Sequence, residues 1–234
     1  LRLNPSQPVW IAGSTRPGEE EIVLEAHARV RREVPEAVLV LAPRHLERLP
    51  EIERLLSGRR TGYVRRTQAG QELIPPPVIL LDTLGELAAL YGLGRAAFVG
   101  GSLAPFGGHN PLEPAAQGVP VIMGPHTDHV REAFEHLARG GGAVRCADAE
   151  SLGREVVALL KHPEDARGRG AKGRDIVKTL RGAAARNAEL LKKLMCIKSW
   201  GREVRHWRAE NPMPSNSSPT TSDWQGGDWP EWRD

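Results

Sequence analysis

Short apolar runs alternate with amphipathic stretches along most of this chain. Residues 19–34 repeat apolar side chains at helical spacing and Pro35 ends the repeat, which predicts a helix. Residues 38–42 form a continuous apolar run, which is typical of a parallel strand buried on both faces. The same criteria predict strands at residues 9–12, 63–66, 78–81, 96–99, 119–123 and 143–146, and helices at residues 46–56, 128–139, 151–161 and 183–194, from Asp82 or Thr83 to Tyr91, and in a segment that ends at Gln117.

Strands and helices therefore alternate at short intervals. This order predicts an α/β fold, a Rossmann-like doubly wound parallel sheet with helices on both faces. Ligands of such sheets bind at the carboxyl ends of the strands. We therefore expect the functional side chains in the loops that follow Ala12, Ala42, Leu81, Val99 and Met123.

Three segments are expected along the chain. Residues 1–8 start without an initiator Met and are interpreted as a linker from an N-terminal domain that this sequence lacks. Residues 9–194 are expected to hold the folded domain. Residues 195–234 are expected to be a low-complexity, disordered tail, because residues 211–222 are rich in Pro and Ser and poor in apolar side chains.

The composition fits one globular domain with additions. The 234 residues are 40% hydrophobic and 26% charged, which is enough chain to bury a proper core. No apolar run approaches the roughly 20 residues that span a bilayer. Cys146 and Cys196 lack the spacing of metal ligands and weakly favour a reducing compartment.

Positive charge is concentrated near the C-terminus. Residues 161–208 carry 14 Lys and Arg against 5 Asp and Glu, whereas the whole chain has a net charge of only +3. This segment is either a solvated helical face or a surface for an anionic partner, such as an anionic membrane. A nucleic-acid partner is disfavoured, because no basic motif interleaved with aromatic residues precedes Trp200.

The segment from Phe98 to Ile122 carries the strongest functional signal. It consists of a buried strand, a glycine-rich loop, a helix start and a second buried strand. Glycines let backbone N–H groups approach an anion, and Asn110 as N-cap with Pro111 at the first helical position would direct the helix dipole toward the loop. Glu113, in the first turn, could reach a ribose hydroxyl. The segment therefore predicts a site for a nucleoside mono- or diphosphate.

Four separated motifs lie along the chain. They are Gly13-Ser14-Thr15 with Glu19-Glu20-Glu21, Pro43-Arg44-His45, Asp82-Thr83-Leu84-Gly85-Glu86-Leu87, and Gly100-Gly101-Ser102 with Gly107-Gly108-His109-Asn110-Pro111-Leu112-Glu113-Pro114. Together they resemble those of the 3-deoxy-D-manno-octulosonic acid (Kdo) transferases, which move Kdo from CMP-Kdo to the lipid A precursor of Gram-negative bacteria. The resemblance covers residues 9–194 and implies the donor-binding half of a GT-B enzyme, which has two Rossmann-like domains facing a cleft.

The resemblance also implies which residues contact the CMP moiety. Arg44 would grip the phosphate, the backbone at Leu84-Gly85-Glu86 would pair with the pyrimidine edge, and Glu113 would bind the ribose. Each position has a simpler interpretation, as a surface arginine, a capped helix or an ordinary N-terminal turn. The implied contacts are Pro43, Arg44, Leu84, Gly85, Glu86, Asn110, Pro111, Leu112 and Glu113, with Ser14, Thr15, His45, Gly101, Ser102, Gly108 and His109 as weaker candidates.

The resemblance implies no catalytic residue in this chain. The glutamate expected to act as general base, the lipid A precursor site and the membrane anchor belong to the missing half. The reaction would be direct displacement by a deprotonated acceptor hydroxyl as CMP leaves, without metal or cofactor. The full enzyme would work at the cytoplasmic face of the inner membrane. We expect this chain alone to bind CMP-Kdo without transferring the sugar.

Two alternatives share part of this evidence. Another GT-B enzyme, such as a UDP-sugar transferase or a nucleotide-sugar epimerase, would also have the glycine-rich loop followed by a segment like Ala116-Gln-Gly-Val-Pro-Val121. The Pro-Arg-His and Asp-Thr-Leu-Gly-Glu motifs argue against it. The second alternative is an inactive nucleotide-binding remnant that acts as a binding module through its basic segment.

Overall fold

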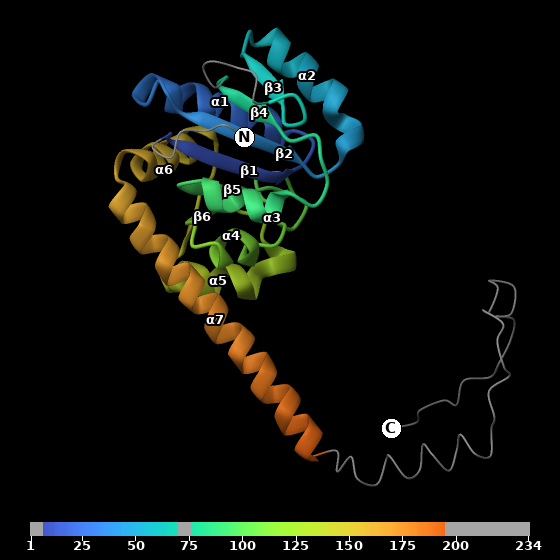
Figure 1. Ribbon diagram of the computed structural model, residues 1–234, viewed down its shortest axis with the longest axis vertical. Coiled ribbons are helices and arrows are strands. Elements are labelled where there is room, and N and C mark those ends of the chain that lie inside the picture. The colour runs from blue at the N-terminus through green and yellow to red at the C-terminus, as the bar shows by residue number, and fades with distance from the viewer. Residues whose placement is uncertain (1–6, 70–75, 195–234) are drawn as a thin grey trace, which may run out of the picture. The chain divides into compact units, whose positions relative to one another are not determined.

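A parallel sheet of seven strands forms the centre of the protein in the computed structural model, which describes residues 7–69 and 76–194, with side chains up to Leu180 (Figure 1). The strand order is β3-β4-β2-β1-β5-β6-β7, and every neighbouring pair is parallel. The strands are β1 (Val9–Thr15), β2 (Val38–Pro43), β3 (Tyr63–Arg65), β4 (Val78–Leu80), β5 (Ala96–Val99), β6 (Val121–Met123) and β7 (Ala143–Arg145).

Helices follow the strands along the chain, as the alternating pattern predicted. The α-helices are α1 (Glu19–Glu33), α2 (Leu49–Gly58), α3 (Leu87–Leu90), α4 (Leu112–Ala116), α5 (Arg131–Arg139), α6 (Ala149–Lys161) and α7 (Pro163–Leu194), and short 3-10 helices cover Leu46–Arg48, Tyr91–Leu93 and Asp128–Val130. The α/β, doubly wound prediction is confirmed. The described residues up to Ala183 gather into one compact unit.

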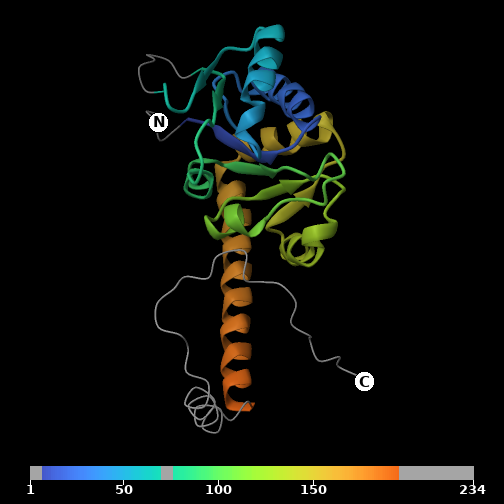
Figure 2. The same cartoon turned by 90° about the vertical axis from the view of Figure 1, so that its right-hand side faces the viewer.

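The central strands are covered on both faces, which explains their continuous apolar sequences. Every residue of β2 and β5 is buried. Side chains alternate between the faces of a strand, so Trp10 and Phe98 pack with helices α1, α2 and α6, whereas Ile11 packs on the opposite face with Tyr91. Helices α5 and α7 also contribute to the core through a cluster around Met123, Phe134 and Val177. Figure 2 shows this layering from the side.

Helix α7 begins at Pro163, about twenty residues earlier than the prediction of a helix at residues 183–194. Its first part contains Gly168, Gly170 and Gly173, which lower helix propensity and hide the pattern. Tertiary packing requires glycine at one of these positions, because a Cβ at Gly170 would lie 1.8 Å from the carbonyl oxygen of Gly118.

Other helices also differ from the prediction at their ends, and three of them lie near the predicted motifs or carry a defined cap. Helix α6 starts at Ala149 because Asp148 and Ser151 form a capping box. Helix α3 starts only at Leu87, because the side chain of Asp82 accepts hydrogen bonds from Thr67 instead of capping a helix. Helix α4 has only five residues and ends at Ala116.

The expected tail at residues 195–234 lies outside the described residues, as does the expected linker up to residue 6. Across residues 7–69 and 76–194, no helix combines the length and the apolar character that crossing a membrane requires.

Candidate functional site

The strand order reverses between β1 and β5. The chain runs from β1 to β2 on one side of β1 and later returns to β5 on the other side. A doubly wound sheet opens its ligand crevice at such a point, beyond the carboxyl ends of the strands. The loops after β1, β2, β5 and β6, with the motifs around Ser14, Arg44 and His109, all leave from this edge.

The glycine-rich loop after β5 already holds an anion that belongs to the protein. The two carboxylate oxygens of Glu19 accept hydrogen bonds from the backbone N–H groups of residues 101–104, at 2.7, 2.9, 2.8 and 3.2 Å in that order. The N–H of Arg16 also donates to this carboxylate, at 2.9 Å. Glu19 is fully buried. The expectation that these N–H groups receive a ligand anion is therefore corrected, because they bind Glu19.

Three of the weaker candidates serve the same internal arrangement. Ser102 is buried, and its hydroxyl donates to the Val99 carbonyl at 2.6 Å and accepts from the N–H of Gly124 at 2.9 Å. Thr15 is also buried, with its hydroxyl donating to Glu20 at 2.9 Å. The N–H of Gly101 is used by Glu19. These groups brace the loops and are not free to bind a ligand in this structure.

The two loops approach so closely that only glycine fits at position 100. A Cβ there would lie 2.4 Å from the carbonyl oxygen of Ser14 and 2.7 Å from the Cα of Thr15. Ser14 itself adopts a left-handed backbone with φ of 56°. The site is thus built on a tightly locked junction of the loops after β1 and β5.

Basic side chains gather beside this junction. The guanidinium of Arg16 lies over the ring of Phe106, with its carbon 4.4 Å from the ring centre, and it contacts Nε2 of His45. Stacking on an aromatic face holds a guanidinium in place. Arg16 is not among the residues that the sequence motifs predicted for the site. The residue stands one position after the Gly13-Ser14-Thr15 motif, but only the contact with Phe106, 90 positions further along the chain, reveals its place.

The positive charges of the neighbouring basic side chains act on the ring of His109. Burial lowers the pKa of His109, and the positive charges of Arg16, Arg44, His45 and His129 lower it further. Its backbone N–H donates to the Gly100 carbonyl at 3.0 Å. Among the described residues, Nε2 of His109 is buried with no hydrogen-bond partner. The structure therefore brings together Arg44, His45 and His109 of the predicted set, and adds Arg16.

The Pro43-Arg44 pair occupies the carboxyl end of β2. Pro43 is buried as the last residue of the strand, and the Arg44 side chain is exposed. The backbone N–H of Arg44 donates to the Thr15 carbonyl at 3.0 Å, which ties the loop after β2 to the end of β1. A fixed backbone with an exposed guanidinium suits a residue that meets an anion from solvent.

Asn110 forms a turn before α4, but it is not the N-cap as predicted, because Pro111 is the N-cap and the short helix begins at Leu112. Its side-chain oxygen accepts from the N–H of Leu112 at 3.1 Å, and its side-chain nitrogen donates to the Glu113 carboxylate at 3.3 Å. Asn110 and Glu113 are exposed, whereas Pro111 is buried. Because α4 has five residues, it supplies little of the expected helix dipole. At the start of α4, the groups best placed to contact a ligand are therefore the exposed polar side chains of Asn110 and Glu113.

The Leu84-Gly85-Glu86 turn lies after β4 on the same edge of the sheet. Leu84 is 77% exposed, an unusual environment for a large apolar side chain, and Gly85 has a left-handed φ of 82°. The Glu86 carboxylate accepts from Arg66 at 3.0 Å and also from the Thr83 hydroxyl. The turn is therefore pinned at its end while its apolar tip faces outward.

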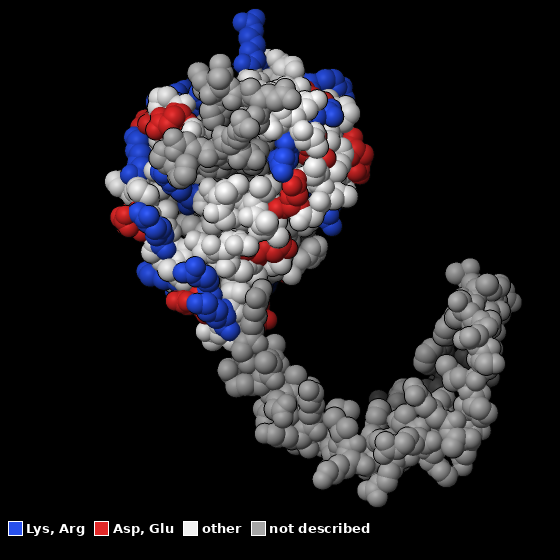
Figure 3. All heavy atoms as spheres, in the orientation of Figure 1, with Lys and Arg blue, Asp and Glu red and all other residues white. Residues whose placement is uncertain are grey.

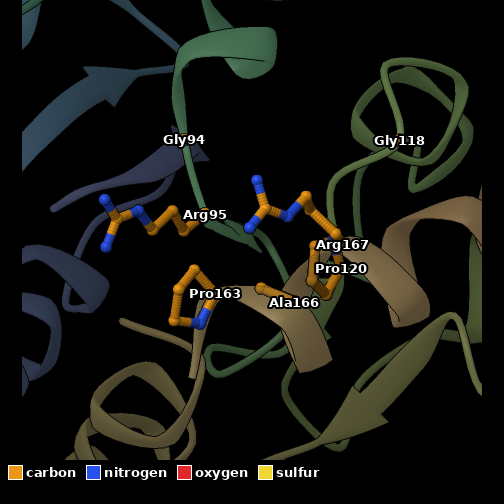
Figure 4. A pocket seen from close by; sticks show the side chains of 7 residues that line it. All are labelled: Gly94, Arg95, Gly118, Pro120, Pro163, Ala166 and Arg167. Atoms are coloured by element: carbon orange, nitrogen blue, oxygen red, sulfur yellow. The ribbon is translucent and has the colours of Figure 1, made fainter. Parts of the chain in front are cut away.

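The cavity shown in Figure 4 lies away from the predicted contact residues. Within the part of the chain that the structure describes, no three His, Cys, Asp or Glu side chains group as metal ligands. The cavity has a volume of about 280 Å³ and is lined by residues from the opposite, amino-terminal edge of β5 and β6 (Figure 4). Its lining includes Arg95, Arg167 and Pro163 and none of the predicted contacts.

The basic character of residues 161–208 is partly neutralised where the structure describes it. Arg169 pairs with Glu155 at 3.5 Å, Lys178 pairs with Asp175 at 3.2 Å, and Arg167 pairs with Glu164. Figure 3 shows basic and acidic side chains interspersed on the face it presents. These pairs fit the interpretation as a solvated helical face.

The chain is similar to several curated Kdo transferases, and no protein-family model matches it. It is 41% identical to the 3-deoxy-D-manno-octulosonic acid transferase of Haemophilus influenzae over 187 residues, which cover 80% of this chain and 44% of the relative. It is 37% identical to the Bordetella pertussis enzyme of the same name over 161 residues, which cover 67% and 38%. The chain thus spans less than half the length of these relatives.

One solved structure covers the same unit. The crystal structure of the C-terminal CMP-Kdo binding domain of WaaA from Acinetobacter baumannii matches with a TM-score of 0.69 and 29% identity, over 74% of this chain and 90% of that domain. TarM, at 11% identity and a TM-score of 0.54, shares the fold alone. The predicted resemblance and the GT-B type of domain are confirmed, and the alternative of another GT-B enzyme is not favoured.

Proposed function

We propose that this chain, which is similar to the Kdo transferases and to the C-terminal CMP-Kdo binding domain of one of them, binds CMP-Kdo at the carboxyl edge of its sheet. In this role it holds the donor and then the leaving CMP while Kdo moves to an acceptor. The proposal includes the acceptor expected from the resemblance, the lipid A precursor, and work at the cytoplasmic face of the inner membrane.

The observation that carries the proposal is the gathering of cationic side chains at the point where the strand order reverses. Arg44 from the loop after β2 and Arg16 from the loop after β1 lie near His109 of the loop after β5, close enough for their positive charges to lower its pKa. A sheet of this type binds nucleotides at that point. The anionic part of a nucleotide sugar would find its charge partners at this edge.

Distinct residues would hold distinct parts of CMP. Arg44 is exposed on a fixed backbone and would take the phosphate. Glu113 and Asn110 are exposed and hydrogen-bonded to each other, and would offer a carboxylate and an amide to the ribose. The exposed Leu84, beside the left-handed Gly85, would cover the pyrimidine while the turn backbone pairs with its edge.

The chemistry proposed for this half is stabilisation of the leaving group. As the bond between the anomeric carbon and the phosphate oxygen breaks, negative charge grows on CMP, and fixed guanidinium groups lower the energy of that state. The acceptor hydroxyl is deprotonated by a base that we do not assign to this chain. We propose neither a metal nor a cofactor, because Arg16 and Arg44 supply the positive charge.

Calorimetric titration with CMP tests the proposal. We expect the 234-residue chain to bind CMP more tightly than UMP or UDP, and Arg44→Gln to weaken CMP at least about tenfold, because a charge-assisted hydrogen bond is lost. Arg54→Gln is the matched control, since Arg54 is an exposed arginine on α2 whose side chain donates only to the Pro50 carbonyl in the described structure. Tighter binding of UDP, or equal binding by the Arg44→Gln and Arg54→Gln variants, would contradict the proposal.

A further inference from the structure

We propose that Arg16, together with His45 and His109, forms a second anion subsite beside Arg44 that takes the carboxylate of the sugar acid in the donor. This inference rests on the proposed function, because it concerns the same site and the same ligand. It makes Arg16 a specificity-determining residue, which distinguishes a CMP-linked sugar acid from a CMP-linked neutral sugar.

Arg16 is held in place by three contacts from three parts of the chain. Its backbone N–H donates to the buried Glu19 carboxylate at 2.9 Å, and its guanidinium stacks on Phe106 and contacts Nε2 of His45. Restriction of a long side chain in the absence of ligand reduces the entropy lost on binding. Within the described residues, the Nε atom of Arg16 is nonetheless buried without a hydrogen-bond partner.

His109 presents a second unsatisfied group on the same side of the junction. Its backbone is fixed to Gly100, and its Nε2 is buried with no partner in the described residues. A buried polar atom without a partner costs roughly 1–3 kcal/mol. A ligand oxygen at this position would remove that cost, provided that the neutral ring carries its proton on Nε2.

The carboxylates near Arg16 and His45 already have partners within the protein. Glu19 accepts from the backbone N–H groups of residues 101–104, and Glu20 forms a buried ion pair with Arg48 at 2.7 Å. Glu47 lies 3.4 Å from His45 and is exposed. In the described structure, neither Arg16 nor Arg44 has an ion pair with a carboxylate.

The negative charges of the ligand match the two guanidinium groups, of Arg16 and Arg44, that have no carboxylate partner in the described structure. The donor CMP-Kdo carries one negative charge on its phosphodiester and one on the carboxylate of the sugar acid, two charges for two guanidinium groups. Because Arg44 is exposed and Arg16 is stacked and half-buried, the two groups meet different parts of the ligand. A CMP-linked neutral sugar would leave Arg16 and Nε2 of His109 unsatisfied, and that penalty produces discrimination.

The test compares two ligands against matched variants of the whole chain. The dissociation constants of CMP and of freshly prepared CMP-Kdo are measured by calorimetry for the wild type, Arg16→Gln, Arg16→Lys and the control Arg54→Gln. We expect Arg16→Gln to weaken CMP-Kdo about tenfold and CMP less than about twofold. Arg16→Lys keeps the charge without the planar stacking, so we expect an intermediate loss for CMP-Kdo. Thermal unfolding of each variant checks that it folds.

The outcomes separate the two proposals. Failure of the wild type to bind either ligand overturns the proposed function. Binding of both ligands with no effect of Arg16→Gln overturns the subsite and leaves the donor role intact. An equal loss of CMP and CMP-Kdo affinity assigns Arg16 to the phosphate and likewise overturns the carboxylate subsite. If neither Arg16 variant folds, the loss of CMP-Kdo affinity in His109→Ala, with CMP unchanged, decides the question.

Discussion

The buried carboxylate of Glu19, at the start of α1, accepts a hydrogen bond of 2.9 Å from the backbone N–H of Ser102, in the loop after β5. The two residues are 83 positions apart in the sequence. Their contact joins the two loops that flank the reversal of strand order. The carboxylate accepts from the backbone N–H groups of the glycine-rich loop and also from the N–H of Arg16, whose guanidinium stacks on Phe106.

Replacing Glu19 by Gln should strongly destabilise the fold. An amide group cannot accept from all five backbone N–H groups that the carboxylate now serves, so buried donors lose their partner. We expect a loss on the order of 3 kcal/mol in the free energy of unfolding. Urea denaturation measures it, with Glu21→Gln as the control because Glu21 is exposed on the same helix. Equal stability of the two variants would refute this role of Glu19.

Gly100→Ala should separate the loops after β1 and β5. The new Cβ would collide with the backbone of Ser14 and Thr15, which has no flexible side chain to give way. We expect a destabilisation of about 1–3 kcal/mol, typical of overpacking. Gly58→Ala serves as the control, since nothing lies within 4 Å of the added Cβ at the end of α2. The idea fails if both variants unfold at the same temperature.

The buried side chain of His27 should make stability depend on pH between about 6.5 and 4. Burial lowers the pKa of His27 to about 4, against an ordinary value of 6.5. The neutral ring accepts from Nε1 of Trp10 and donates to the Pro77 carbonyl, both at 3.0 Å. Below pH 6.5 the His27 ring is protonated in the unfolded chain but not in the folded chain. Stability therefore falls as the pH is lowered, until His27 is protonated in both states below about pH 4.

The loss across this window should approach about 3 kcal/mol, from 1.36 kcal/mol per pKa unit. Urea unfolding at several pH values measures the slope, and His27→Gln should remove most of it above pH 5, while His109, whose pKa is also lowered, still contributes. Carboxylates whose pKa is lowered, such as Glu53 beside Arg65, affect stability only near and below the ordinary pKa of a glutamate. The pH dependence of stability above about pH 5 therefore comes from histidine. A ring signal of His27 that titrates near pH 6.5 in the folded protein would contradict the prediction.

The pKa of His109 should report the charge of the basic cluster. Burial lowers it first, and the guanidinium of Arg16 is the largest of the charges that lower it further. Arg16→Gln should therefore raise the pKa of His109 toward its ordinary value, and CMP bound to the wild type should also raise it. NMR titration of the histidine ring protons measures both shifts. An unchanged pKa in Arg16→Gln would show that the two side chains are not electrostatically coupled, and Arg54→Gln provides the reference.

Local sequence patterns were enough for most elements of the fold. Continuous apolar runs marked β1, β2 and β5 because strands covered on both faces need apolar side chains at every position. Helix α7 was predicted only in its last third, since its first part contains glycines that lower helix propensity, one of which, Gly170, is required by the close backbone approach of Gly118. Helix propensity is a local property, whereas that contact depends on the packed structure.

For the candidate site, the sequence by itself determined that a glycine-rich loop, an arginine after a strand and an exposed turn would face one edge of a parallel sheet. The placement of Arg44, His45 and His109 near one another agrees with that expectation. Which contact each residue makes with CMP stays a prediction. Only the tertiary structure decided that Glu19 occupies the loop amides and that Arg16 stacks on Phe106. Both facts depend on which strands become neighbours, and that choice is made by packing over long separations in the chain.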